Sequence, residues 1–345
     1  MKLCASYLCF FTWACKIAIF NNSGYDRFVT ERKNVALIIE TSNAYARGIL
    51  HGLRDFIRDE RGWSIYLAEH GRHEVDASFP PDWDGDGVIA RIETEAIADI
   101  VRRMKVPTVD VSAARLMRGI PWVETDDAAI TELAVDHLIG CGLRNLAFFG
   151  DPAYNWSRWR CHYFRKLAQR MGFAPHIFNL PNRTQSQVNW YKERDRIFSW
   201  LKDLPKPIGI FAGYDACAQQ LLEICRYHDL SVPDEVAVVG VDNDELLCDL
   251  AYPSLTSVIP NTRQTGYIAA SLLKRMMAGE AFTEEKISIK PLGIEKRMST
   301  DIVAVEDRHV SAAVAFIREN AHRNIGVEDV LKRIPLSRRV FETSF

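Results

Sequence analysis

The sequence predicts an α/β protein with two doubly wound parallel-sheet lobes, followed by a short all-α C-terminal segment. Short apolar runs alternate with segments of helical periodicity from residue 35 to residue 300, which is typical of parallel βαβ units. The two halves of this region are similar in length and style. Residues 306–345 have the apolar spacing of short helices. A chain of 345 residues has room for two or three such domains.

Each half repeats the same order of strand and helix. In the first half we expect strands at 35–39, 64–68, 87–90 and 107–111, and helices at 45–58, 95–104 and 128–139. In the second half we expect strands at 146–150, 208–212 and 236–241, and helices at 160–171, 187–201, 215–228 and 263–277. Two such lobes enclose a cleft, and ligands of doubly wound folds bind at the carboxyl ends of the strands.

The N-terminal residues 1–34 form an apolar extension outside this pattern. Residues 3–20 are strongly apolar and follow Lys2, so a secretory signal and a marginal membrane span are both considered. Lys16 interrupts the run, and no Ala-x-Ala site follows it. We favour a third interpretation, in which an upstream start codon adds residues that belong to no domain.

Composition argues against several function classes. The net charge of −2 gives no overall attraction to nucleic acid, so any DNA contact must come from a local patch. The eight cysteines include no CxxC pair and no zinc-site spacing, and we expect buried free thiols in a reducing cytoplasm. Dinucleotide, phosphate-loop and nucleophile-elbow motifs are missing from the sequence. We therefore expect no metal, no cofactor and no catalysis.

Nine short motifs in order resemble the type I periplasmic-binding-protein fold used by LacI/GalR repressors, over residues 35–300. They are Asn43-Ala-Tyr-Ala-Arg-Gly, Asp86-Gly-Val-Ile-Ala, Pro107-Thr-Val-Asp-Val, Asp126-Asp-Ala-Ala, His137-Leu-Ile-Gly-Cys-Gly, Asn145-Leu-Ala-Phe-Phe-Gly, Asp215-Ala-Cys-Ala, Val239-Gly-Val-Asp-Asn-Asp and Leu255-Thr-Ser-Val. Residues 306–345 resemble the opening of an AraC-type helix-turn-helix domain. The predicted order, with a ligand-binding domain before a DNA-binding domain, is similar to that of the bacterial xylose operon regulators.

This resemblance implies a cytoplasmic, sugar-responsive transcriptional regulator, with xylose or a related pentose as effector. It also implies a double-stranded DNA operator as partner, a homodimer and no membrane association. The alternative is a secreted or periplasmic sugar-binding protein of a transport system, which would use residues 3–20 as its signal and would need no C-terminal segment.

The resemblance and the strand ends nominate four ligand-binding residues in the second lobe. Asp215 and Asp242 each follow a predicted strand, so both carboxylates are expected in the cleft, although Asp215 would equally serve as a helix N-cap. Arg160 is expected at a helix start, where its charge opposes the helix dipole, which favours a ligand role. Trp156 is expected either to stack on the sugar or to pack in the core.

Three further candidates lie in the first lobe. Asn43 and Tyr45 occupy the first strand-to-helix loop. Arg91 ends the strand 87–90 at a position where the xylose regulators have Asp. An arginine there is expected either to favour a sugar acid or to pair with Glu93.

The C-terminal segment is expected to contain helices at 308–320 and 327–332, followed by a recognition helix capped by Ser337. Arg338 and Arg339 would face the major groove, while Val340 and Phe341 pack inward. A complete AraC-type domain has two helix-turn-helix units, and only the first falls before Phe345. We therefore expect a truncated DNA reader with weak or no operator binding.

Overall fold

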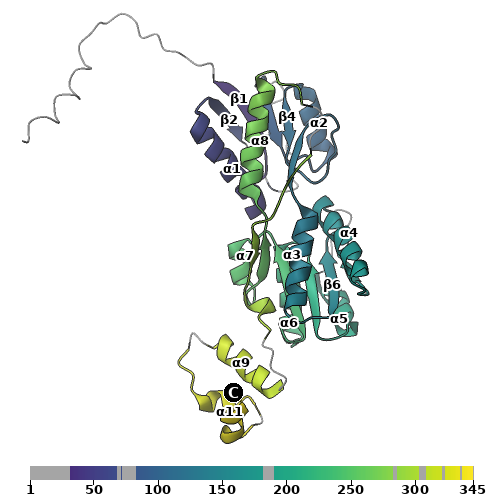
Figure 1. Cartoon of the computed structure of the whole chain (residues 1–345), viewed down its shortest axis with the longest axis vertical. Coiled ribbons are helices and arrows are strands. Elements are labelled where there is room, and N and C mark those ends of the chain that lie inside the picture. The colour runs from purple at the N-terminus through teal and green to yellow at the C-terminus, as the bar shows by residue number, and fades with distance from the viewer. Residues whose placement is uncertain are drawn as a thin grey trace, which may run out of the picture. The chain divides into compact units, whose positions relative to one another are not determined.

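The described residues form two six-stranded sheets, shown in a computed structural model (Figure 1). The structure describes residues 32–67, 71, 83–181, 190–282, 286–302, 308–320, 323–334 and 336–344. The first sheet has the order β11 (Lys286–Ile289), β5 (Trp122–Thr125), β4 (Thr108–Asp110), β3 (Gly87–Ala90), β1 (Lys33–Ile38), β2 (Trp63–Leu67), with parallel neighbours throughout. The second sheet has the order β12 (Gly293–Glu295), β10 (Thr256–Ile259), β9 (Val236–Val241), β8 (Ile208–Ala212), β6 (Asn145–Gly150), β7 (His176–Asn179). Only β12 runs antiparallel to its neighbour among these strands.

Helices cover both faces of each sheet, as a doubly wound fold requires. In the first lobe, alternate residues of β1 pack against α1 (Ala44–Glu60) and α8 (Thr262–Met277) on one face, and against α2 (Glu95–Met104) on the other. In the second lobe, α5 (Trp190–Asp203) and α6 (Asp215–Tyr227) pack on one face. The opposite face holds α3 (Asp127–Gly140) and α4 (Asn155–Arg170). The short helix α7 (Glu245–Leu250) follows β9.

Two glycines let α1 and α8 approach until their backbones touch. A Cβ on Gly52 would lie 1.9 Å from the carbonyl oxygen of Arg263, and one on Gly266 would lie 2.0 Å from that of Ile49. These distances leave no space for a side chain, so the helix pair depends on glycine at both positions. The two helices lie side by side over the first sheet (Figure 1).

In the described part of the chain, the polypeptide passes between the two sheets three times. It leaves the first sheet from β5 into α3, returns from β10 into α8, and leaves again from β11 into β12. The fold class predicted from the sequence is therefore confirmed. The helices and strands predicted in both halves are present with shifts of a few residues, except at α4.

The sequence-based start of α4 is wrong by five residues. The helix was expected from Arg160, but it begins at Asn155. Asp151 forms the turn that precedes the helix: its side chain accepts from the Ala153 backbone N–H at 3.0 Å and its carbonyl accepts from the Tyr154 N–H at 3.2 Å. Arg160 therefore lies in the second turn, and the helix-dipole argument for its ligand role does not apply. Strands β5, β7, β10, β11 and β12 were not predicted.

The C-terminal segment contains α9 (Arg308–Glu319), α10 (Val327–Leu331) and α11 (Arg338–Ser344), close to the predicted bounds. Their small core comprises Ala313, Val330, Ile334 and Phe341. The Val340 N–H donates to the Ser337 side chain at 3.4 Å, which confirms the predicted cap. The inward position predicted for Val340 is wrong, because this residue is 48% exposed while Phe341 is buried. A helix as short as α11 has one buried stripe, and Phe341 occupies it.

Several predictions concern residues outside the described part. Residues 1–31 of the N-terminal extension, the first residues of the predicted helix 187–201, and residues 306 and 307 lie outside it. Within the described residues, no helix is long and apolar enough to cross a membrane, and no cluster of three metal-ligand side chains is found. The five described cysteines have free thiols, and Cys217, Cys225 and Cys248 are buried as expected.

Candidate functional site

A cavity that is partly open to solvent, with about 380 Å³ of empty space including that open part, is lined by residues of both lobes. Charged, aromatic and small apolar side chains contribute together to its wall. The lining residues are Tyr45, Arg91, Val111, Ala113, Glu124, Thr125, Asp127, Trp156, Arg160 and Asp242.

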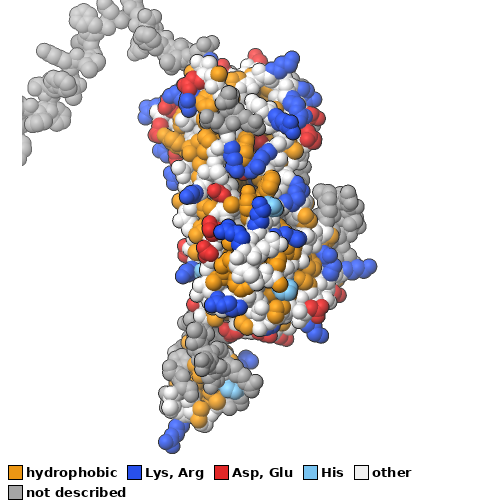
Figure 2. All heavy atoms as spheres, turned by 45° about the vertical axis from the view of Figure 1, so that its right-hand side comes forward, with side chains coloured by type: hydrophobic (Ala, Val, Ile, Leu, Met, Phe, Trp, Pro, Cys, Tyr) orange, Lys and Arg blue, Asp and Glu red, His pale blue; other side chains and the backbone are white. Residues whose placement is uncertain are grey.

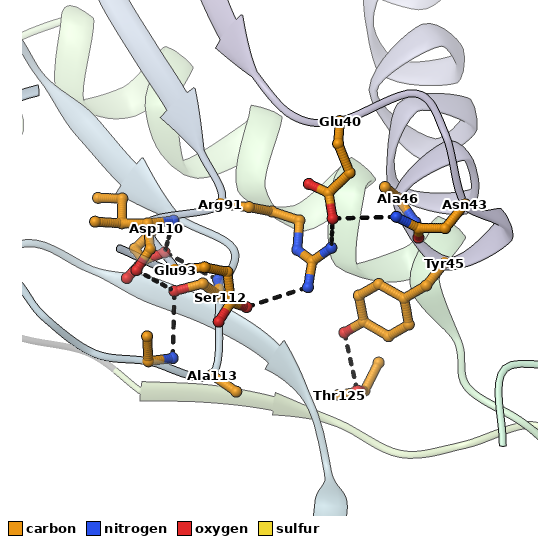
Figure 3. Close-up of polar contacts among 12 residues, drawn as sticks. Glu40, Asn43, Tyr45, Ala46, Arg91, Glu93, Asp110, Ser112, Ala113 and Thr125 are labelled. Atoms are coloured by element: carbon orange, nitrogen blue, oxygen red, sulfur yellow. Dashed lines mark hydrogen bonds and ion pairs between the residues drawn. The ribbon is translucent and has the colours of Figure 1, made fainter. Parts of the chain in front are cut away.

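Arg91 follows β3 and is held by two carboxylates (Figure 3). Its Nη1 donates to Oε1 of Glu40, and its Nη2 donates to Oε1 of Glu93 at 3.1 Å. Burial opposes the charge of Arg91, but the attraction of Glu40 and Glu93 prevails, and the pKa of the guanidinium is raised. The predicted pairing with Glu93 is thus confirmed, while the partner Glu40 was not foreseen.

Asn43 is the residue before α1, and Tyr45 lies in the first turn of that helix. The Tyr45 hydroxyl and Thr125 Oγ1 are 3.0 Å apart, and the Arg91 guanidinium lies 5.0 Å from the ring centroid. Burial raises the pKa of Tyr45 to about 12, so the phenol stays protonated at neutral pH. Asn43 caps α1 by accepting from the Ala46 N–H at 2.9 Å, and its Nδ2 donates to Glu40 at 3.1 Å. Asn43 therefore orients Glu40 and is not part of the cavity lining.

Glu124 is the next-to-last residue of the short strand β5 and carries a buried carboxylate of this lobe's cavity wall. Arg115 Nη2 donates to Glu124 Oε1 at 2.5 Å, and the Arg115 guanidinium lies 4.0 Å from the Trp122 ring and 5.0 Å from the Trp159 ring. Burial, with the charge of Asp127, raises the pKa of Glu124 to about 7. Its second oxygen, Oε2, is buried and has no hydrogen-bond partner among the described residues.

Arg160 and Asp127 form the central ion pair of the second lobe. Arg160 Nε donates to Asp127 Oδ1 at 2.8 Å, and Arg160 Nη1 donates to the carbonyl of Gly213 at 2.7 Å. Both side chains are buried. Burial raises the pKa of Asp127 to about 6 although Arg160 opposes this shift. Asp127 opens α3 directly after its N-cap Asp126.

Trp156 lies within a group of aromatic rings at the start of α4. It stacks on Tyr154 with ring centroids 4.6 Å apart and meets Tyr214 edge-on at 5.0 Å. The Arg160 guanidinium lies 5.4 Å from the Trp156 ring. Trp156 therefore packs against the core, which was one of the two roles weighed for it from the sequence, and it also lines the cavity. Stacking on a sugar stays a prediction.

The two strand-end aspartates have different positions. Asp242 lines the cavity, and its backbone has φ of 112°. Asp215 is buried beneath it and is not part of the lining; its Oδ1 accepts from Ser257 Oγ at 2.6 Å and its Oδ2 from the Asp244 N–H at 2.8 Å. Burial and the negative charge of Asp242 raise the pKa of Asp215 well above its usual value. Asp215 therefore supports the loop that carries Asp242.

Of the seven predicted ligand residues, the structure places five in the cavity wall: Asp242, Arg160, Trp156, Arg91 and Tyr45. Sequence reasoning missed the other five lining residues. Glu124 and Thr125 end a strand that was not predicted, and Asp127 was not among the predicted ligand residues. Asp127 follows β5 by two residues, so the strand-end argument that nominated Asp242 would have reached Asp127 had β5 been predicted. Val111 and Ala113 carry no distinctive side chain.

The cavity combines hydrogen-bond donors from arginine, carboxylate acceptors and one large aromatic face. Such a set holds a small polyhydroxylated molecule, because charge-assisted bonds grip hydroxyl groups and a ring covers C–H surface. Three guanidinium groups at the site, those of Arg91, Arg115 and Arg160, are paired with carboxylates.

Comparisons with known proteins agree with this fold. Residues 34–128 match the family model described as the XylR N-terminal domain, and residues 135–300 match that of a periplasmic binding protein-like domain. The chain is 32% identical to the xylose operon regulatory protein of Escherichia coli K12, over 92% of this chain and 82% of the relative. It is 31% identical to that of Haemophilus influenzae, over 90% and 81%. A solved structure of the xylose-binding transcription activator xylR superposes with a TM-score of 0.79 at 30% identity, covering 91% of this chain and 81% of that one.

Proposed function

The chain belongs to the family of bacterial xylose operon regulatory proteins, and from this premise we propose that it is a transcriptional regulator whose effector is xylose or a related pentose. The observation that carries the proposal is the shared cavity, in which Arg91 and Tyr45 of one lobe face Arg160, Trp156 and Asp242 of the other. A ligand that contacts both lobes stabilises the arrangement in which they are close, and this preference is what shifts a two-state sensor.

Family membership favours the regulator over the transport protein. The curated relatives are regulatory proteins, and they match 92% and 90% of this chain. The match therefore extends beyond the sensor lobes into the C-terminal segment. A regulator acts on DNA in the cytoplasm, and we include this location in the proposal together with a homodimer, the common symmetry of soluble regulators.

DNA contact is proposed for the start of α11. Ser337 caps this helix, and Arg338 and Arg339 are exposed there while Phe341 anchors it from inside. Arginines at the N-terminal end of a recognition helix are placed to contact base edges and phosphates. On the face shown in Figure 2, basic side chains are interspersed with acidic and apolar ones. A local basic element is therefore needed for DNA binding, as the net charge also indicates.

Calorimetric titration with D-xylose, other pentoses and hexoses tests the sensor role. We expect one pentose to bind, and Asp242→Asn to weaken it about tenfold or more, because a buried hydrogen bond to a charged group contributes about 1.5–3 kcal/mol. Asparagine tolerates positive φ, so this variant removes the charge and keeps the backbone. Asp229→Asn is the matched control, since Asp229 is exposed and has φ of 55°. Absence of binding for every sugar tried would refute the proposal.

A further inference from the structure

Arg91 occupies a place where an arginine would ordinarily recognise an acid. It lines the cavity, and its side chain is only 5% exposed. Arginine is the usual partner of carboxylate groups, because its planar fork matches their two oxygens. Taken alone, Arg91 would therefore predict a sugar acid as ligand.

The charge of Arg91 is already balanced within the protein. Glu40, whose side chain is 7% exposed, pairs with Nη1, and Glu93 pairs with Nη2 at 3.1 Å. Glu40 follows β1 and is held in place by the Nδ2 of Asn43 at 3.1 Å. Figure 3 shows the two carboxylates approaching the guanidinium from different directions. Both terminal nitrogens of Arg91 thus have carboxylate partners within the protein.

The remainder of the site also has an excess of carboxylates. Arg160 is paired with Asp127, and Arg115 with Glu124, while Asp242 lies in the same wall. A ligand carboxylate would add a further negative charge to this buried surface, and burying a charge without a free counter-charge is strongly unfavourable. An uncharged hydroxyl-rich ligand meets no such penalty.

Two buried polar atoms of the wall residues match an uncharged ligand. Arg91 Nε and Glu124 Oε2 have no hydrogen-bond partner among the described residues. Buried donors and acceptors are nearly always paired in folded proteins, and an additional molecule supplies the partner where the protein does not. A hydroxyl group accepts from the first of these atoms or donates to the second, whereas an ionised carboxylate cannot donate to the second.

We propose that Glu40 sets the charge of the ligand: by neutralising Arg91 it makes the cavity specific for uncharged polyhydroxy molecules and excludes sugar acids. This inference rests on the proposed function, since it assumes that the cavity binds a sugar. Glu40 is a specificity-determining residue that acts through Arg91 and is not itself part of the cavity lining.

The test compares D-xylose, xylitol and D-xylonate by calorimetric titration of the intact chain. Xylitol and D-xylonate are both open chains of five carbons, so they differ mainly in charge. We expect the wild-type protein to bind D-xylose and to bind D-xylonate far more weakly. Equal or tighter binding of D-xylonate would overturn the inference and leave the sensor role intact. Failure of all three ligands, and of the other sugars above, would count against the proposed function itself.

Glu40→Gln supplies the decisive variant, because glutamine keeps the hydrogen bond to Arg91 and removes the charge. We expect the ratio of the D-xylonate Kd to the D-xylose Kd to fall about tenfold or more. Glu60→Gln is the matched control. Glu60 is an exposed partner of Lys274 in the same lobe, and its replacement by glutamine changes the net charge by the same amount. Should Glu40→Gln fail to fold, Glu93→Gln removes the other carboxylate charge beside Arg91. We expect this variant to lower the same Kd ratio by a smaller factor. An unchanged ratio in the folded variant would refute the role of Glu40.

Discussion

Arg297 donates from Nη1 to the side-chain oxygen of Asn243 at 2.9 Å, and Asn243 directly follows the cavity residue Asp242. The same Nη1 donates to the carbonyl of Leu255 at 2.9 Å. The backbones of Asp242 and Asn243 have positive φ angles of 112° and 46°, and positive φ is uncommon for residues other than glycine. Arg297 therefore holds the positive-φ turn that presents Asp242 to the cavity.

Arg297→Met is expected to weaken pentose binding about tenfold while the protein stays folded. Loss of the two hydrogen bonds from Nη1 frees the Asp242 loop, and a hydrogen bond to a charged group contributes about 1.5–3 kcal/mol. Titration calorimetry measures the change, with Lys296→Met, an exposed neighbour, as control. If both variants bind as the wild type does, the loop is held by other contacts and this role for Arg297 is wrong.

Glu124 predicts that ligand binding releases protons near neutral pH. Burial raises its pKa to about 7 in the ligand-free protein. A hydroxyl that donates to the buried Oε2 favours the ionised carboxylate, so the pKa falls and a proton leaves. At pH 7 up to roughly half a proton per chain is expected, and almost none above about pH 8.5, where the group is already ionised.

Titrations in buffers of different ionisation enthalpy measure this proton release directly. Glu124→Gln should abolish it, while Glu132→Gln on the adjacent helix α3 should leave it unchanged. The same pKa shift affects folding: because the pKa is raised from 4.5 to about 7 in the folded state, Glu124 makes stability fall as pH rises between these values. The wild type should therefore lose more stability than Glu124→Gln across that window. Equal slopes for the two proteins would show that Glu124 is not buried as described.

The strands and helices of the two lobes could be predicted from the sequence more completely than the residues of the cavity. Strands β8 and β9 are short, uniformly apolar runs that pack on both faces, so their pattern identified them. Strand β5 was missed because Glu124 and Thr125 place polar groups at its end, where the cavity needs them. The polar side chains of Glu124 and Thr125, which break the apolar pattern of the strand, are the same ones that line the cavity.

Most of the other site features that the sequence did not predict depend on contacts between residues far apart in the chain. Glu40 and Arg91 are 51 positions apart, and no local pattern predicts that the ends of β1 and β3 bring them together. Arg160 was nominated through a helix start that the structure places five residues earlier, so its position in the cavity was predicted on a wrong premise. Asp215 and Asp242 were indistinguishable by sequence, since both follow a strand, and only the packing beneath the loop separates them.

Trp156 is expected to contribute an aromatic face to the ligand. Trp156→Ala should weaken pentose binding about tenfold, since aromatic contacts contribute about 0.5–1.5 kcal/mol beyond the area they bury. Trp156→Phe retains a ring beside Tyr154 and Tyr214, so it should lose less. Calorimetry gives both values, and thermal unfolding without ligand separates them from lost packing. Equal affinity for the alanine and phenylalanine variants would assign Trp156 to the core alone.

Arg338 and Arg339 predict how DNA affinity depends on salt. Both side chains are exposed at the start of α11, so replacing them with alanine should leave thermal unfolding and sugar binding unchanged. If each contacts the DNA backbone, the double variant should lower affinity and reduce the slope of log K against log salt by about 2. Fluorescence anisotropy with a duplex selected by the wild-type chain from a random pool measures both quantities.

The matched control for this charge change is Arg102→Ala with Arg103→Ala, two exposed arginines of α2 in the first lobe. Counterion release depends on where a charge meets the phosphates, so the control should keep the wild-type slope even though the net charge changes equally. An equal loss of DNA affinity in both double variants would mean that affinity depends on the overall charge and that α11 does not contact the DNA specifically. Failure of the wild-type chain to select any duplex would refute DNA reading by this helix.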